Sequence, residues 1–170
     1  MFNKTLFEQG INIIPDVAPV DFDADQAGDY VNLANVDRAY FCLYCAAGSS
    51  GTMHIDMNQA QDASGTGVKA LTFSRYYYKV ADNLSTVGQF TEVELDTAVS
   101  DLDLAGTDVQ DDQFMIVIEI PADSLDVNGG FTHVQQQNEG DNLGAARLCA
   151  SWWILTGDAY AKSVPNSAIA

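Results

Sequence analysis

Gln113-Phe-Met-Ile-Val-Ile-Glu-Ile120 is the stretch that decides the fold class of this 170-residue chain. Phe114, Ile116 and Ile118 alternate with residues of the opposite face, and Pro121 ends the run. Strict period-two alternation of β-branched and aromatic residues is typical of a half-buried β-strand. The stretch therefore predicts a strand of a sandwich or barrel.

Similar runs recur along most of the chain, whereas helical periodicity is nearly absent. Turn signals rich in glycine and aspartate separate them at the short spacing of a sandwich. Residues 143–155 include good helix formers, but the run Cys149–Leu155 ahead of Gly157 favours a doubly covered strand. We predict an all-β, jelly-roll-like β-sandwich of about eight strands. The expected strands are 31–33, 39–47, 52–58, 69–80, 88–95, 113–120, 131–137 and 143–155.

Three local interpretations refine this picture. Residues 39–47 are apolar on both faces, which predicts a central strand covered on both sides. Residues 52–58 follow the turn Gly48-Ser-Ser-Gly51, so they are expected to complete a hairpin with that strand. Residues 96–112 contain six aspartates with little periodicity, which indicates a solvated loop.

Residues 1–29 differ from the rest, because they are irregular and carry Pro15, Pro19 and the acidic stretch 21–25. We expect an extended N-terminal arm and an acidic loop over 1–29, followed by one β-sandwich domain over 30–170. The start of the chain lacks the pattern of a signal peptide, and no window predicts a membrane helix. The apolar residues of the arm are the expected interface with an adjacent subunit or a larger assembly: Phe2, Leu6, Phe7, Ile11, Ile13 and Ile14.

The charge balance narrows the class of partner. The chain has 24 acidic and seven basic residues, a net charge of −17 and a pI near 4.1. Such a charge repels phosphate backbones, so direct nucleic-acid binding is not expected. It keeps a protein soluble at high concentration, and binding of cations or of a basic partner surface is the alternative.

The three cysteines, Cys42, Cys45 and Cys149, cannot all pair within one chain. Cys42 and Cys45 are three apart, so on a strand they point to opposite faces and cannot share a metal ion. We therefore predict packing residues without a disulfide framework, in a chain made in a reducing cytoplasm.

Other candidate sites are weak. His54 and His133 lack a companion nucleophile motif, so no enzyme activity, cofactor or metal is predicted. The acidic stretch 21–25 resembles the start of a calcium loop, but Gln26 and Asn32 replace the glycine and glutamate of an EF-hand. Aromatic pairs on strands usually pack, although they also stack on sugar rings in carbohydrate-binding modules. The residues concerned are Tyr76, Tyr77, Tyr78, Trp152 and Trp153.

Three stretches carry a resemblance to a known family. The first runs from Gln59-Ala-x-Asp62 through Gly65-Thr66-Gly67-x-Lys69 to Phe73. The second joins Val117–Ile120 to Asp123-Ser-Leu125-Asp126-Val127-x-Gly129-Gly-Phe131, and the third runs from Leu143 to Ala161. In this order, over about residues 28–165, they resemble the head decoration, or cement, proteins of tailed bacteriophages. The chain departs from the family in its longer apolar arm and in the aspartate-rich stretch 96–112.

The resemblance implies a jelly-roll-like β-sandwich that assembles as a homotrimer on the outer face of an icosahedral head. Its partner would be the major capsid protein, and it would tie neighbouring capsomers together in the virion. The mechanism would be multivalent binding, in which several weak contacts act at high effective concentration. A carbohydrate-binding module or another virion surface adhesion protein remains the alternative.

Overall fold

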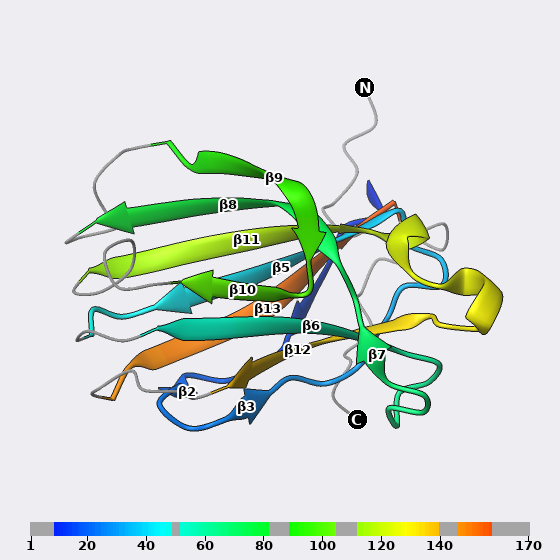
Figure 1. The fold of residues 1–170 in the computed structure, drawn as a ribbon, viewed down its shortest axis with the longest axis horizontal. Coiled ribbons are helices and arrows are strands. Elements are labelled where there is room, and N and C mark those ends of the chain that lie inside the picture. The colour runs from blue at the N-terminus through cyan, green and yellow to red at the C-terminus, as the bar shows by residue number, and fades with distance from the viewer. Residues whose placement is uncertain (1–8, 49–51, 82–88, 105–111, 140–145, 158–170) are drawn as a thin grey trace.

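The computed structural model describes residues 9–48, 52–81, 89–104, 112–139 and 146–157, and it confirms the all-β sandwich (Figure 1). Two antiparallel sheets, here sheet A and sheet B, form its two layers. Sheet A has the order β1-β13-β5-β11-β8-β9, with β2 beside β13, and sheet B has the order β10-β6-β12-β3, with β4 beside β12 and β7 beside β6. No helix in the described segments has the length and apolar character needed to cross a membrane.

The strands have the following bounds. Sheet A contains β1 (Asn12–Pro15), β2 (Val20–Asp21), β5 (Arg38–Cys45), β8 (Phe73–Ala81), β9 (Thr91–Val99), β11 (Gln113–Pro121) and β13 (Leu148–Thr156). Sheet B contains β3 (Gln26–Ala27), β4 (Val31–Asn32), β6 (Met53–Ala60), β7 (Lys69–Ala70), β10 (Asp101–Leu104) and β12 (His133–Glu139). Two short 3-10 helices, η2 (Ala122–Ser124) and η3 (Val127–Gly129), follow β11.

The core lies between the two sheets and follows the predicted alternation. Phe114, Ile116 and Ile118 of β11 are fully buried, and they face the buried residues of β6. Phe41 and Trp153 pack with ring centroids 5.2 Å apart, on neighbouring strands β5 and β13. The central position of β5, between β13 and β11, and the strand character of residues 148–156 are both confirmed.

Two predicted connections are wrong, because the chain passes between sheets where we expected it to stay in one. β5 and β6 lie in different sheets and therefore form no hairpin. The expected strand 69–80 is divided into β7 in sheet B and β8 in sheet A. Leu71 and Phe73 are buried at the crossing, and the Leu71 amide donates to the Met57 carbonyl. Period-two patterning continues through such a crossing, so it does not reveal the change of sheet.

The expected solvated loop 96–112 is also wrong over its first half. β9 continues to Val99, and β10 pairs with β6 from Asp101 to Leu104. Leu102 and Leu104 are buried, whereas Asp101 and Asp103 are exposed. The alternation Asp-Leu-Asp-Leu was a strand signal that the high aspartate content obscured. Residues 105–111 lie outside the described residues.

The expected arm and acidic loop over 1–29 are partly built into the sandwich. β1 and β2 pair with β13, and β3 pairs with β12. Ile14 and Phe22 are buried in the core. The edges of a sheet need cover, and proline is tolerated there, so Pro15 is compatible with an edge strand. The prediction of a segment outside the domain therefore does not hold for these short strands.

A disulfide between Cys45 and Cys149 corrects the prediction of packing cysteines without a disulfide framework. The two residues are direct register partners on β5 and β13. The two cysteines are 104 residues apart, so their spacing in the sequence could not predict this pairing. Cys42 points to the opposite face of β5, is buried and remains a free thiol. All three cysteines are buried, as expected of packing residues.

Asp16 links the end of β1 to β13 by hydrogen bonding. The Ser151 hydroxyl donates to Asp16 Oδ2 at 2.7 Å, and the Val17 amide donates to the Ser151 hydroxyl at 3.1 Å. A Cβ added to Gly28 would lie 1.9 Å from Asp16 Oδ1, so glycine permits this close approach. Burial raises the pKa of Asp16 to about 6, although the Ser151 hydrogen bond opposes the shift.

We expect Asp16 to make the free energy of unfolding depend on pH. Between about pH 4 and pH 6 the folded chain holds this proton and the unfolded chain releases it, so stability falls as pH rises through this window. Asp16→Asn should therefore stabilise the protein by about 1–3 kcal/mol at pH 7.5 relative to its effect at pH 4. Urea unfolding at the two pH values measures this difference. The control is Asp23→Asn, at an exposed position. If both variants change the free energy of unfolding equally at the two pH values, Asp16 is not the source of the pH dependence.

Candidate functional site

The first two family-like stretches meet at one end of the sandwich, where β7, η2 and η3 lie (Figure 1). Gln59, at the end of β6, links them. Its Nε2 donates to the Ala70 carbonyl at 3.3 Å, and its Oε1 accepts from the Asp126 amide at 2.9 Å. Gln59 is 5% exposed, so both bonds satisfy buried groups. We call the unit formed by Gln59, Gln61, Asp62, Lys69, Asp126 and Phe131 the polar corner.

The loop after β6 is shaped by Asp62. Its carboxylate accepts from the Ser64 amide at 2.9 Å and from the Thr66 amide and hydroxyl at 3.1 and 2.7 Å. The Thr66 bonds, led by the hydroxyl, lower the pKa of Asp62. Gly65 and Gly67 have φ of +78° and +68°, a region that favours glycine, which explains the Gly-Thr-Gly sequence. The loop is therefore held in one conformation by its own side chains.

Lys69 and Asp126 join the two stretches on the exposed side of the polar corner. Lys69 Nζ contacts an Asp126 oxygen at 2.5 Å and lies 4.3 Å from the centroid of the Phe131 ring. The Lys69 hydrogen bond lowers the pKa of Asp126. Asp126 also accepts from the Gly129 amide at 3.0 Å, and Gln61 donates to the Gly129 carbonyl at 2.8 Å. Residues about 60 positions apart thus form one hydrogen-bonded unit.

Two apolar side chains project from the polar corner. Val68 is 49% exposed and Val127 is 63% exposed, and each belongs to one of the two joined stretches. Single exposed apolar residues are common on protein surfaces. Their position on a rigid, hydrogen-bonded unit nevertheless makes the corner suited to contacting another protein.

We expect Gln59→Ala to lower the free energy of unfolding by about 1–3 kcal/mol, because it leaves the Asp126 amide and the Ala70 carbonyl without their partner. Gln61→Ala is the matched control. Gln61 is exposed and donates one side-chain bond, so its removal should cost less than about 1 kcal/mol. Urea unfolding followed by fluorescence measures both. Equal losses for the two variants would show that Gln59 does not hold the corner.

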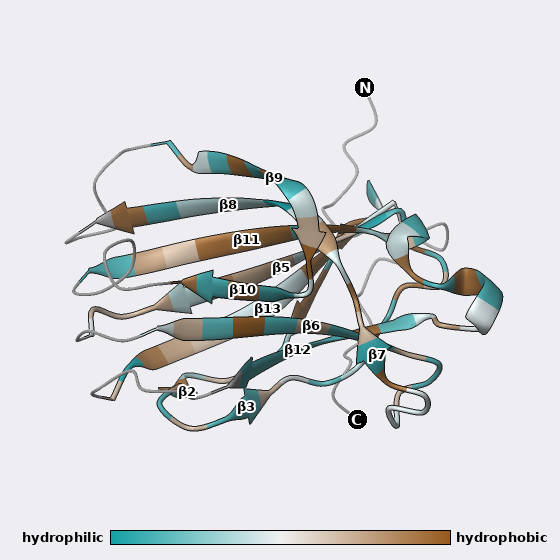
Figure 2. Cartoon of the chain, in the orientation of Figure 1, coloured by the Kyte–Doolittle hydropathy of each residue, from teal (hydrophilic) through white to brown (hydrophobic). Residues whose placement is uncertain are grey.

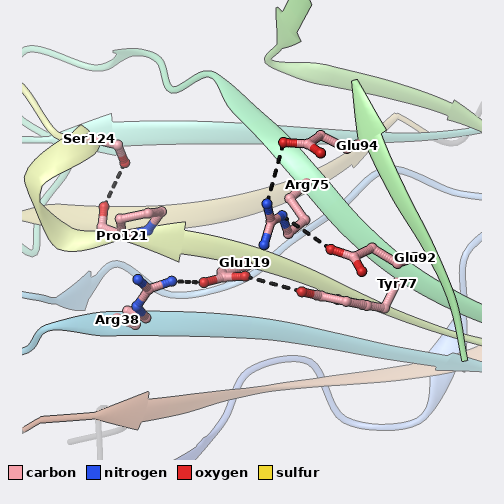
Figure 3. A network of polar contacts seen from close by, with 8 residues as sticks. All are labelled: Arg38, Arg75, Tyr77, Glu92, Glu94, Glu119, Pro121 and Ser124. Atoms are coloured by element: carbon pink, nitrogen blue, oxygen red, sulfur yellow. Dashed lines mark hydrogen bonds and ion pairs between the residues drawn. The ribbon is translucent and has the colours of Figure 1, made fainter. Parts of the chain in front are cut away.

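A second polar network covers part of the outer face of sheet A (Figure 3). Arg38 forms an ion pair with Glu119, whose other oxygen lies 3.4 Å from the Tyr77 hydroxyl. Arg75 lies 3.4 Å from both Glu92 and Glu94. A surface pocket of about 330 Å³ lies beside them. Both guanidinium groups therefore face carboxylates of the same chain, and their positive charges are compensated within the network.

The two histidines occupy different settings. His54 Nδ1 lies 3.7 Å from Asp101 Oδ1 and contacts Asp103 across the β6–β10 pair. These three residues form the one group in the described segments that places three potential metal ligands within 4.8 Å. His133 Nδ1 lies 2.9 Å from the Thr132 hydroxyl, and burial lowers the pKa of His133. The Thr132 hydroxyl also donates to the Gln61 carbonyl at 3.2 Å, so it links β12 to the loop after β6.

The structure separates the other predicted site residues. Of the arm residues, Ile13 is 41% exposed on the outer face of sheet A, Ile14 is in the core and Ile11 is half-buried. Phe2, Leu6 and Phe7 lie outside the described residues. Tyr76 and Tyr78 pack against the core and Trp153 is buried, which leaves Tyr77 and Trp152 on the outer face. Asp21 accepts from the Asp23 and Arg147 amides and serves as a local anchor.

Comparison with known proteins gives no assignment. No family model, curated protein or solved structure matches the chain.

Proposed function

We propose that this protein is a decoration protein of the head of a tailed bacteriophage. It would bind the outer surface of the icosahedral shell as a homotrimer and stabilise contacts between subunits of the major capsid protein. One observation supports this proposal above the others. The two stretches that resemble the decoration proteins, around Gln59–Phe73 and Val117–Phe131, form a single hydrogen-bonded corner. The resemblance thus extends over a structural unit rather than over scattered residues.

The polar corner suits attachment to a shell. Its backbone is fixed by Gln59, Asp62 and Asp126, so little conformational entropy is lost when it binds. Val68 and Val127 offer apolar contacts on this fixed backbone. A weak contact of this size becomes strong when several copies bind together at one symmetry axis. We therefore assign capsid attachment to the polar corner.

The charge of the chain fits the same role. A decoration protein is made in the host cytoplasm, accumulates in many copies and then remains on the virion surface. A net charge of −17 keeps copies apart in solution. It also makes attachment sensitive to the charge of the capsid surface, which would need to be neutral or basic where the protein docks.

A carbohydrate-binding module is the alternative. Such a module needs several exposed aromatic rings in one groove. Tyr76, Tyr78 and Trp153 face the core, so Tyr77 and Trp152 would have to serve, and the Tyr77 hydroxyl lies 3.4 Å from Glu119. Binding on a glycan array that is lost in Tyr77→Ala would favour this alternative.

The stability of phage heads provides the test. Heads produced without this protein should rupture at a lower temperature than complete heads, and purified protein added back should restore the difference. The variant Val68→Lys/Val127→Lys should restore it at least 10-fold less effectively at equal concentration, because both exposed valines lie on the polar corner. Asn58→Lys, on the outer face of sheet B, is the control. Heads that are equally stable with and without the protein would overturn the cementing role.

A further inference from the structure

The outer face of sheet A is apolar across four neighbouring strands. β11 is hydrophobic over most of its length (Figure 2). Phe114, Ile116 and Ile118 face the core, so Met115 and Val117 face outward. Six outward-facing residues on these strands form what we call the apolar stripe: Ile13, Tyr44, Val117, Leu148, Trp152 and Ile154.

The pairing register makes the stripe continuous. Ile13 of β1 lies opposite Ile154 of β13. Trp152 of β13 and Val117 of β11 both lie opposite Cys42, from the two sides of β5. Three members of the stripe are exposed: Ile13 by 41%, Tyr44 by 37% and Leu148 by 56%. An antiparallel sheet that faces water normally carries polar residues on that face, so this composition requires an explanation.

The stripe also lacks charge, in a chain whose net charge is −17. None of its residues is acidic or basic, and the outward residues between them on β5, β11 and β13 are uncharged as well. The nearest charged side chains on β5 and β11 are Arg38 and Glu119, which form an ion pair with each other. At the margins of the stripe, Lys79 of β8 lies opposite Met115, and Asp21 of β2 lies opposite Leu148. The excess negative charge therefore lies on other parts of the chain.

The stripe is somewhat smaller than one side of a standard protein interface. It crosses four strands and extends from Leu148 to Ile154, which gives on the order of 500 Å² in plan at about 4.8 Å per strand and about 3.3 Å per residue. A standard interface buries about 800 Å² on each partner, and the accessible area of a side-chain surface exceeds its plan. Contiguous exposed apolar patches larger than a few hundred Å² are rare on monomers.

We propose that the apolar stripe binds a second copy of this chain. Two chains of net charge −17 repel each other, so a stable contact between them has to form where each is uncharged. The stripe meets this condition, and apolar composition is typical of contacts between identical subunits. A permanent contact also keeps the stripe out of water before the protein reaches its final partner. The stripe would then be a subunit interface of the homotrimer in the proposed function. The inference rests on that function only for the number of subunits.

Sedimentation velocity tests the proposal. Wild-type protein should be oligomeric at micromolar concentration, and Ile13→Lys/Tyr44→Lys/Leu148→Lys should weaken self-association at least 100-fold. All three side chains are more than one-third exposed, so the sandwich should remain folded by circular dichroism. If the triple variant does not fold, Leu148→Lys alone decides, because Leu148 is the most exposed of the three. The matched control Val68→Lys/Val127→Lys replaces exposed valines outside the stripe and should leave the oligomer intact.

Three results would overturn the proposal. The first is a monomeric wild type at all concentrations. The second is a folded stripe variant that stays oligomeric. The third is a monomer that associates only after residues 1–8 or 158–170 are deleted, which would mean that the chain covers its own stripe. If the protein forms an oligomer that depends on the stripe but does not bind heads, this inference stands and the proposed function is wrong.

Discussion

Removing the Cys45–Cys149 disulfide is expected to lower the free energy of unfolding by about 3–5 kcal/mol, the largest effect predicted for this protein. The disulfide closes a loop of 104 residues between β5 and β13. It therefore excludes many open conformations of the unfolded chain, and this restriction grows with loop length. The comparison is between wild type and Cys45→Ala/Cys149→Ala, measured by urea unfolding without reductant.

Cys42 supplies the control. Cys42→Ala removes a buried thiol that has no disulfide partner, so it should cost only about 1 kcal/mol and leave the response to reductant unchanged. Burial raises the pKa of Cys42 to about 12, so this thiol should react slowly in the folded protein. Denatured, unreduced protein should show one reactive thiol per chain. Three reactive thiols without reductant would contradict the disulfide.

Deleting residues 1–15 is expected to lower the free energy of unfolding by about 2–4 kcal/mol, because it removes β1 and the buried side chain of Ile14. The loss should also expose the edge of β13 next to Trp153 and Leu155. The reference variant lacks only residues 1–8 and keeps every described residue. Thermal and urea unfolding of the two deletions measure the difference, and equal stability would show that β1 adds nothing to the sandwich.

This expectation replaces the simpler one drawn from the sequence, in which residues 1–29 form an arm and a loop outside the sandwich domain. The alternation in Asn12–Pro15 is too short to predict a strand, and Pro15 argues against one. Only the pairing with Trp152–Leu155 shows that Ile14 faces the core and Ile13 faces outward. The two isoleucines therefore have different roles: Ile14 stabilises the sandwich, and Ile13 belongs to the apolar stripe.

Local patterns predicted the parts of the fold that depend on local physics. The alternation along β11, the central position of β5 and the strand 148–156 all follow from periodicity. What could not be predicted depends on register between distant segments. The disulfide, the change of sheet at Leu71 and the links from Gln59 to Asp126 join residues that no spacing rule relates.

The same limit applies to the candidate sites. The resemblance placed Gln59 and Lys69 in one stretch and Asp126 in another, but it did not indicate that the two stretches touch. The exposure of the apolar stripe was also missed, since residues 39–47 and 149–155 were expected to be covered on both faces, whereas Tyr44 and Leu148 are exposed.

Binding to empty, expanded heads assembled without this protein tests the central claim most directly. We predict that purified protein cosediments with such heads and saturates at a fixed number of copies set by the symmetry of the shell. Val68→Lys/Val127→Lys should bind at least 10-fold more weakly, and Asn58→Lys should bind like the wild type. Folded, oligomeric protein that remains in the supernatant at every concentration would contradict the account and favour the carbohydrate-binding alternative.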